Sequence, residues 1–205
     1  VQIRALAEAG ILVSLGHSEA DYDTCVAAAK AGARCVTHLF NAQTPLENRA
    51  PGVVGAALEL GQLSAGLIAD GVHVHAVSMG VALRAKRGPG RIFLVSDAMA
   101  TAGSDIDSFT LNGREYRRCG NRLTLEDGTL AGAHLELADA VRNVEKTGAV
   151  DQEAALSMAT QVPAALIKRT DIGCLTPGGR ADVVHLDDEG RLARVWRGGK
   201  TVPLA

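Results

Sequence analysis

Four apolar stretches decide the fold of this chain: ILVSLGHS at residues 11–18, CVTHLFNA at 35–42, SAGLIADGVH at 64–73 and RIFLVSDAMA at 91–100. Each has the length and composition of a buried β-strand and ends in polar residues. Helix-like or loop segments separate them, so the order along the chain is β-α-β-α-β. This alternation is typical of a parallel sheet with right-handed crossovers.

The residues that start and end helices in the first half of the chain support that order. Asp21 and Asp23 favour the first turn of a helix, which Gly32 ends, and Gly88-Pro89-Gly90 closes a later one. A long polar loop, NAQTPLENRAPG, follows the second strand, and long loops at strand ends often carry function. We expect strands at 11–16, 35–40, 64–69 and 91–96, and helices at 1–9, 19–31, 74–86, 134–147 and 152–168.

The polar residues that end the four strands can bind metals or transfer protons. His17 and His38 end the first two strands, Asp70 and His73 the third, and Asp97 the fourth. A parallel (β/α) barrel carries its chemistry at the C-terminal ends of its strands, so these residues are expected to share one rim. Histidines and aspartates on one rim indicate metal-assisted hydrolysis.

His17 and His38 are the candidate metal ligands. They are 21 residues apart, about one βα unit, so adjacent strands would bring them to a single ion. Neutral imidazole binds zinc, and also iron or manganese. The alternative is that each is a core histidine hydrogen-bonded to a backbone carbonyl.

Asp97 is the candidate general base and acid. An ionised carboxylate is costly in an apolar barrel mouth unless it has a partner. A water activated by a metal is such a partner, because the carboxylate takes its proton and later delivers it to a leaving group. The alternative is that Asp97 only caps the segment after it.

The long loop holds candidate groups for an anionic substrate. Arg49 is expected either to grip a phosphate through two parallel hydrogen bonds or simply to be solvated. Asn41 either binds sugar hydroxyls or phosphate oxygens, or caps its own turn. Beyond the third strand, His73 is expected to face the site and His75 to lie on the surface.

After residue 100 the pattern changes to antiparallel β-structure. FTLNGREYRR and RLTLEDGTL alternate apolar and polar residues around Asn112-Gly113 and Asp127-Gly128, which predicts a β-hairpin insertion at about 107–130. The segment 128–133, GTLAGA, precedes an amphipathic helix, so its amides are candidates to meet a polar or anionic ligand. The tail is expected to form a hairpin that turns at residues 188–190. We therefore divide the chain into residues 1–178 and a small β-domain portion, 179–205, and interpret His134 and His185 as structural.

Composition excludes several classes of function. A formal net charge of −2 argues against a nucleic-acid partner, and 47% hydrophobic residues are enough for a core. No apolar run reaches the roughly 18 residues of a membrane span, and no basic-then-apolar leader precedes residue 10. The four cysteines form no CxxC pair and are interpreted as free thiols of a cytoplasmic protein.

Six segments together resemble one family. They are GHSEA, THLFNA, ENRAPG, IADGVH, VSDAMA and GTLAGAHLELADAVRN, and in this order they look like the N-acetylglucosamine-6-phosphate deacetylases of the amidohydrolase superfamily. The resemblance implies a fold: the second half of a (β/α)8 barrel, with a small antiparallel insertion and a C-terminal hairpin from a companion β-domain. It also implies that the family's earlier strands, which supply a glutamate metal ligand, lie outside these 205 residues.

The resemblance further implies roles for individual residues. His17 and His38 would bind a divalent metal, zinc first and iron or manganese as alternatives, and Asp97 would be the general base and acid. The reaction would be hydrolysis of the acetamide of N-acetylglucosamine 6-phosphate, by a homodimer in the full-length form. The residues implied in substrate contact are Asn41, Ala42, Arg49, Asp70, Gly71, Val72, His73, Ala131, Gly132 and Ala133.

Three functional hypotheses remain open on the sequence. The first is this deacetylase, of which the 205 residues alone are expected to be inactive. The second is another amidohydrolase, acting on N-acetylgalactosamine 6-phosphate or a cyclic amide. The third is an inactive metal-binding fragment without enzymatic function.

Overall fold

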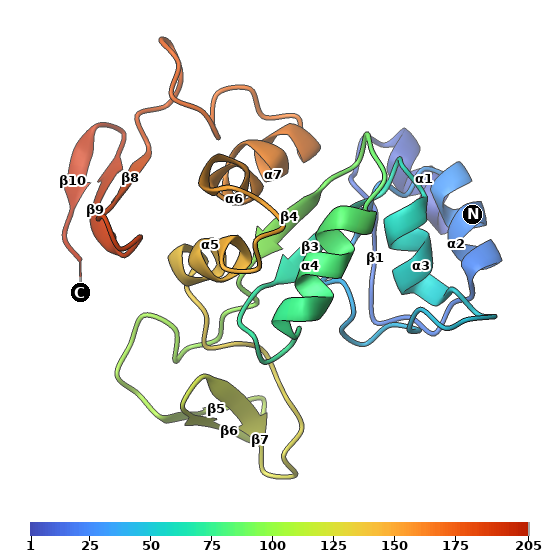
Figure 1. Cartoon of the computed structure of the whole chain (residues 1–205), viewed down its shortest axis with the longest axis horizontal. Helices are drawn as coiled ribbons and strands as arrows, with labels where there is room; N and C mark the ends of the chain where they lie inside the picture. The colour runs from blue at the N-terminus through green and yellow to red at the C-terminus, as the bar shows by residue number, and fades with distance from the viewer. Residues whose placement is uncertain (205) are drawn as a thin grey trace.

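A four-stranded parallel sheet forms the centre of the molecule (Figure 1). The computed structural model describes residues 1–204 and orders the strands β1-β2-β3-β4. Their bounds are Ser14–Leu15, Cys35–Val36, Ser64–Ile68 and Ile92–Val95. Neighbouring strands pair in the order in which they follow one another in the chain, as the βαβ pattern predicts.

The strands are shorter than the sequence predicts: β1 begins at Ser14 rather than at residue 11, and β2 ends at Val36 rather than at residue 40. The backbone turns to positive φ at His17 and again at His38, and L-residues in that region cannot continue a β-ladder. Pairing therefore ends at Leu15 and Val36, and the residues after them belong to loops rather than to the sheet. His17 and His38 therefore lie in loops just beyond the last paired residues.

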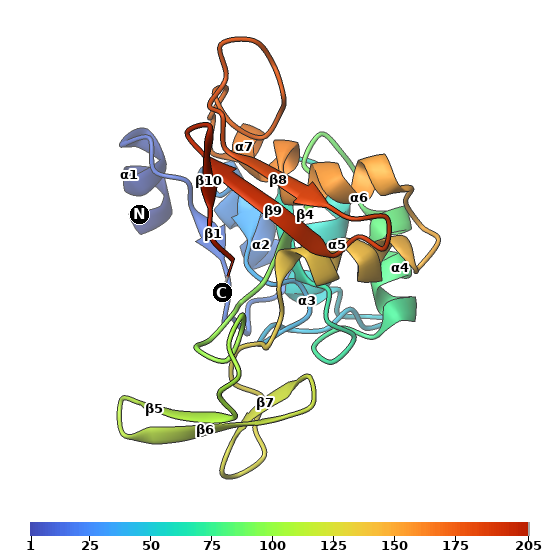
Figure 2. The ribbon, with the colours of Figure 1, turned by 90° about the vertical axis from the view of Figure 1, so that its left-hand side faces the viewer.

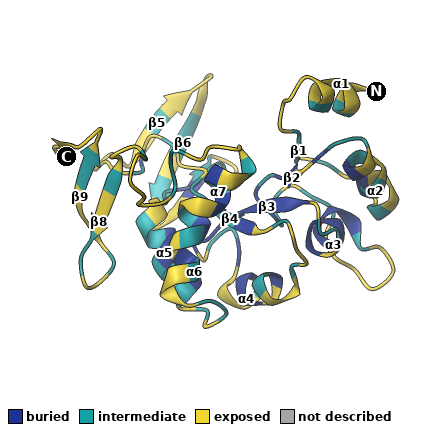
Figure 3. Cartoon of the chain, turned by 90° about the horizontal axis from the view of Figure 1, so that it is seen from above, coloured by how far each residue is buried: buried dark blue, intermediate teal, exposed yellow. Residues whose placement is uncertain are grey.

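The N-terminal half of the chain contains four helices: α1 (Gln2–Glu8), α2 (Tyr22–Lys30), α3 (Gly52–Glu59) and α4 (Ala76–Ala85). Asp21 is the N-cap of α2, where its Oδ1 accepts a hydrogen bond from the Thr24 amide at 2.8 Å. Dark blue, buried residues gather on β2, β3, β4 and α3, whereas α1 has no buried residue (Figure 3). Within residues 1–204, no helix combines the length and the hydropathy that crossing a bilayer requires.

Helix α3 was not predicted, because its sequence lacks a polar face. Its segment, GVVGAALE, is buried at every position from Gly52 to Leu58. A helix that is apolar all round shows no 3.6-residue periodicity, and two glycines further weaken its helical propensity. Burial between its neighbours, rather than local propensity, makes this segment helical.

The helices of the second half are α5 (Leu137–Glu145), α6 (Gln152–Ala159) and α7 (Gln161–Leu166). The single helix expected over 152–168 is wrong: it breaks at Thr160, which has φ −131° and ψ −83°. Pro163 explains the break, because its ring clashes with the carbonyl of a preceding turn and it lacks an amide proton. On α5, the Asn143 side-chain amide donates to the Ala69 carbonyl at 2.9 Å and ties the helix to the end of β3.

Two small antiparallel sheets complete the molecule. The first comprises β5 (Ser108–Leu111), β6 (Arg114–Cys119) and β7 (Arg122–Leu125), and it projects away from the α/β body in Figure 2. Its first turn is the expected one, with positive φ at Asn112 and Gly113.

The second small sheet comprises β8 (Val183–Leu186), β9 (Leu192–Arg197) and β10 (Lys200–Val202). The expected tail hairpin is therefore correct for β8 and β9 but omits β10. That strand returns through Gly198 and Gly199, which both have positive φ. The Arg142 guanidinium of α5 donates to the Gly190 carbonyl at 2.6 Å, which anchors this sheet beside the helices.

Candidate active site

The carboxyl ends of β1 and β2 bring His17 and His38 together. Leu15 pairs with Val36, so each histidine lies two residues beyond the same register position. Their Nε2 atoms are 2.9 Å apart and their rings meet nearly edge to face, with centroids 4.8 Å apart. His17 is exposed, whereas His38 is 8% exposed, so one imidazole is open to solvent and the other is held by the core.

Gly16 permits this close approach. A Cβ at Gly16 would lie 2.7 Å from the Cβ of Thr37, the residue before His38. Any larger residue would push the two strand ends apart and separate the histidines that follow. No local sequence signal marks Gly16, because the contact that requires a glycine there is between strands.

Strained backbone marks the same edge of the sheet. Among residues 1–204, positive φ is found at the non-glycine residues His17 (45°), His38 (26°), Phe40 (80°), Ala42 (49°), Asp97 (50°), Asn112 and Lys168. Five of these seven belong to the strand-end loops. Such conformations cost about 1–3 kcal/mol each and persist where the surrounding structure enforces them, which is common at functional sites.

The two histidines fit a shared divalent metal. Two nitrogens bound to one tetrahedral zinc at about 2.0–2.1 Å would be about 3.3 Å apart, close to the separation found here. The Nδ1 atom of His38 is buried and takes no hydrogen bond within residues 1–204. No third His, Cys, Asp or Glu of the same residues completes a metal-binding group with them.

Asp97 lies further along the same edge, beside the segment Ala131–Ala133. The Ala133 amide donates to the Asp97 carbonyl at 2.8 Å, and the Met99 amide donates to the Ala133 carbonyl at 3.1 Å. A Cβ at Gly132 would lie 2.4 Å from the Met99 side chain, so only glycine fits there. The Asp97 side chain is exposed and takes no hydrogen bond within residues 1–204, which leaves its carboxylate free to act on a substrate.

Asp70 and His73 form a buried pair after β3. The His73 Nδ1 lies 2.6 Å from Asp70 Oδ2, and the amides of Val72 and His73 both donate to Asp70 Oδ1 at 2.8 Å. Burial raises the pKa of the Asp70 carboxyl, but the hydrogen bonds from His73 and Val72 outweigh it, so the pKa is below its usual value. His75 lies outside the pair, exposed, as the N-cap of α4.

The loop after β2 is organised around its backbone. Asn41 donates from its side-chain amide to the Leu39 carbonyl at 3.2 Å, so the turn-capping alternative describes its contact in this structure. The Ala42 carbonyl accepts from the Ser18 amide at 3.0 Å, which joins this loop to the one that carries His17. Arg49 is exposed and makes no ion pair within residues 1–204, so the structure leaves both of its interpretations open.

Two residues that the sequence analysis missed hold this loop. The Thr44 hydroxyl donates to the Ala20 carbonyl at 2.6 Å and accepts from the Val53 amide at 2.8 Å, so it links α3 to the loop before α2. Gln43 donates to the Thr37 carbonyl, next to His38. No local sequence signal marks either residue, because their partners are distant in the chain.

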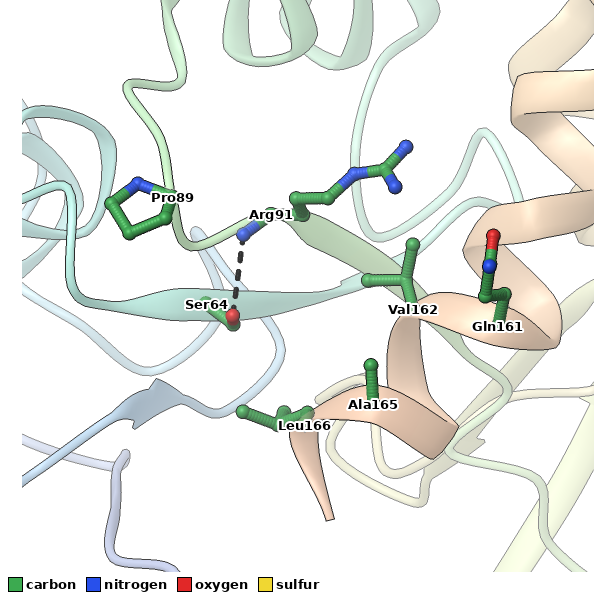
Figure 4. Close-up of a pocket in the computed structure, with 7 residues that line it drawn as sticks. All are labelled: Ser64, Pro89, Arg91, Gln161, Val162, Ala165 and Leu166. Carbon is green, nitrogen blue, oxygen red and sulfur yellow. Dashed lines mark hydrogen bonds between the residues drawn. The ribbon is translucent and has the colours of Figure 1, made fainter. Parts of the chain in front are cut away.

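A cavity lies at the other end of the strands. It has a volume of about 380 Å³ and is lined by Ser64, Pro89, Arg91, Gln161, Val162, Ala165 and Leu166. Ser64 begins β3 and Arg91 directly precedes β4, and Figure 4 shows both beside α7. In parallel α/β folds the chemistry lies at the carboxyl ends of the strands, so this cavity is not the candidate active site.

Comparison with known families identifies the fold. The model of the amidohydrolase family matches residues 2–202 of this chain, which is nearly its whole length. The chain belongs to the amidohydrolase family. Members of this family generally depend on a divalent metal, which agrees with the histidine pair at the strand ends.

Individual relatives narrow the resemblance to deacetylases. The chain is 41% identical over 199 residues to N-acetylgalactosamine-6-phosphate deacetylase of Shewanella sp. (strain ANA-3), and covers 50% of that protein. It is 34% identical over 198 residues to N-acetylglucosamine-6-phosphate deacetylase of Lysinibacillus sphaericus, and covers 51% of it. In each case the alignment includes 97% of this chain.

A solved structure of a deacetylase has the same fold as this chain. The crystal structure of N-acetylglucosamine-6-phosphate deacetylase from Pasteurella multocida superposes with a TM-score of 0.91 at 32% identity, over 98% of this chain and 52% of that one. The chain thus has the mixed α/β fold of these enzymes and spans about half the length of the relatives it matches.

Proposed function

We propose that this chain carries the metal-binding and proton-transfer half of an N-acetylglucosamine-6-phosphate deacetylase. The observation that carries the proposal is the 2.9 Å approach of His17 and His38 at the ends of adjacent strands. Asp97 follows on the same edge, and the relatives with this fold are named as deacetylases of amino-sugar phosphates. The four parallel strands would then be the second half of a (β/α)8 barrel.

In the proposed reaction the chain supplies two metal ligands and one proton carrier. His17 and His38 would hold a divalent metal through Nε2, zinc in the first instance; such a metal polarises a carbonyl and lowers the pKa of water. Asp97 takes a proton from the attacking water as the new C–O bond forms at the acetamide carbon. It then returns that proton to the amine nitrogen as the C–N bond breaks, which yields acetate and glucosamine 6-phosphate.

Substrate recognition is proposed for the loops around this centre. The Arg49 guanidinium, the backbone of Ala42 and the Asn41 amide would bind the phosphate, since positively charged and N–H groups favour an anion. Ala131, Gly132 and Ala133, held against Asp97, would line the sugar or acetamide pocket. The backbone of Asp70, Gly71 and Val72, with the His73 ring, would complete it.

Several finer assignments belong to the same proposal. The divisions into residues 1–178 and 179–205, a homodimeric assembly and a cytoplasmic location are part of it. All four cysteines are free in the structure, which is consistent with a reducing compartment.

The substrate is tested by acetate release from two epimers. The protein expressed from its complete reading frame is expected to deacetylate N-acetylglucosamine 6-phosphate and to leave N-acetylglucosamine without the phosphate largely unreacted. N-acetylgalactosamine 6-phosphate is the second candidate, favoured by the 41% identity to the Shewanella enzyme. Turnover of neither phosphate, with metal supplied, would contradict the proposed function.

Replacing Arg49 is expected to weaken phosphate binding rather than the chemistry. Arg49→Ala should raise KM for the phosphorylated sugar while kcat changes little, because the guanidinium lies away from the scissile amide. Arg84→Ala is the matched control, since it removes an exposed arginine on α4. Equal losses on phosphorylated and unphosphorylated sugars would show that Arg49 is not a phosphate clamp.

The 205 residues expressed alone are expected to be inactive and to self-associate. Four parallel strands leave the outer edges of β1 and β4 unpaired, and the described residues provide two metal ligands where a catalytic zinc site has three. Light scattering and an acetate assay on the same sample test this. A monodisperse monomer with turnover near about 10 s⁻¹, a typical enzyme rate, would refute it.

A further inference from the structure

The loop between β3 and α4 contains a histidine whose protonation is decided by a buried carboxylate. The Asp70 side chain is 2% exposed and that of His73 is 7% exposed. Their 2.6 Å contact joins Asp70 Oδ2 to His73 Nδ1. Neither residue belongs to the metal-ligand pair, and the mechanism proposed above does not use the Asp70 carboxylate.

The two oxygens of this carboxylate have different hydrogen-bond partners. Oδ1 accepts hydrogen bonds from the amides of Val72 and His73, and this turn alone would need only one oxygen. An asparagine would serve it equally well. Oδ2 makes the additional contact to the ring, so the second oxygen is what distinguishes a carboxylate from a simple turn-former at this position.

The contact determines where the His73 proton sits. An ionised carboxylate only accepts hydrogen bonds, so the proton in the 2.6 Å contact belongs to Nδ1. The other ring nitrogen, Nε2, takes no hydrogen bond within residues 1–204. Nε2 is therefore the atom left to meet a ligand, and its ring is held by the loop and the carboxylate together.

We propose that Asp70 is a positioning residue that keeps His73 protonated on Nδ1 and so presents Nε2 to the amino-sugar phosphate. The substrate part of this inference rests on the proposed function, whereas the hydrogen-bond part does not. In the neutral ring with its proton on Nδ1, Nε2 is a hydrogen-bond acceptor. Replacing the partners that orient metal-binding histidines typically changes metal affinity or activity by about 10- to 100-fold, and we expect an effect of the same size for a histidine that binds substrate.

The substitution Asp70→Asn distinguishes the roles of the two carboxylate oxygens. The asparagine retains Oδ1 for the amides of Val72 and His73 but replaces Oδ2 with an NH2 donor. Nδ1 of His73 then has to accept, which moves the ring proton to Nε2. Asp188→Asn makes the same chemical change at an exposed turn and is the matched control.

The readout is the tautomer of His73, measured by ¹⁵N NMR of the histidine-labelled protein from its complete reading frame. The native protein is expected to show protonated Nδ1, and Asp70→Asn the Nε2–H tautomer with kcat/KM lowered about 10- to 100-fold. The control should show neither change. A native Nε2–H neutral tautomer would overturn the inference even if Asp70→Asn did not fold.

Two further outcomes are distinguishable. An inverted tautomer with unchanged kcat/KM would show that Asp70 does not position His73 for the substrate. Absence of deacetylation by the unmodified protein would instead contradict the proposed function, and the tautomer would then decide the role of Asp70 on its own.

Discussion

Asp97→Asn, made in the protein expressed from its complete reading frame, is expected to lower kcat by about 10²- to 10⁴-fold, the usual contribution of a general base and acid. The amide has nearly the shape of the carboxylate but cannot take a proton from water. The Asp97 backbone hydrogen bonds to Ala133 do not involve the side chain, so the fold should be retained. Steady-state acetate release gives kcat, and calorimetry with the sugar phosphate tests whether binding survives.

Asp105→Asn is the control for this change, because Asp105 is exposed on the segment that leads into the insertion. It should behave as the unmodified protein. If Asp97→Asn kept normal kcat, the proton carrier would have to be another group, and the catalytic role proposed for Asp97 would be wrong.

In the protein expressed from its complete reading frame, His17→Ala and His38→Ala are each expected to remove most of the bound metal and to abolish turnover. Each imidazole would supply one metal bond, and the described residues offer no other His, Cys, Asp or Glu to replace it. Metal analysis of the purified protein by mass spectrometry measures the effect directly, without an activity assay.

The matched control is His185→Ala, which removes an exposed histidine on β8. Its metal content should equal that of the unmodified protein. Full stoichiometric metal in the double variant His17→Ala/His38→Ala would show that the 2.9 Å approach of these rings has another purpose.

The sequence by itself was sufficient to predict the four strands of the parallel sheet and the first hairpin of the insertion, and to name the candidate residues. Four apolar runs with polar ends predicted β1 to β4, and the turn at Asn112-Gly113 predicted the hairpin of β5 and β6. Such features are local: strand composition, turn chemistry and the alternation of segments can be read without knowing distant contacts. The roles of the candidate residues remain predictions for the experiments above.

The secondary-structure predictions were wrong where local sequence signals were absent or were overridden by packing. Helix α3 has no polar face, so only its burial reveals it. The expected helix over 152–168 is two helices, separated at Thr160. Strand β10 is short and exposed and depends on pairing with β9 rather than on its own pattern.

Only the tertiary structure decided how the candidate side chains meet. The 2.9 Å approach of His17 and His38 depends on register between β1 and β2 and on the space beside Thr37 that Gly16 leaves. The sequence placed Asp70 and His73 near each other but could not show that one carboxylate oxygen serves the turn and the other the ring. Register, close backbone approach and hydrogen-bond direction are properties of segments packed in three dimensions, whereas composition and periodicity belong to the chain alone.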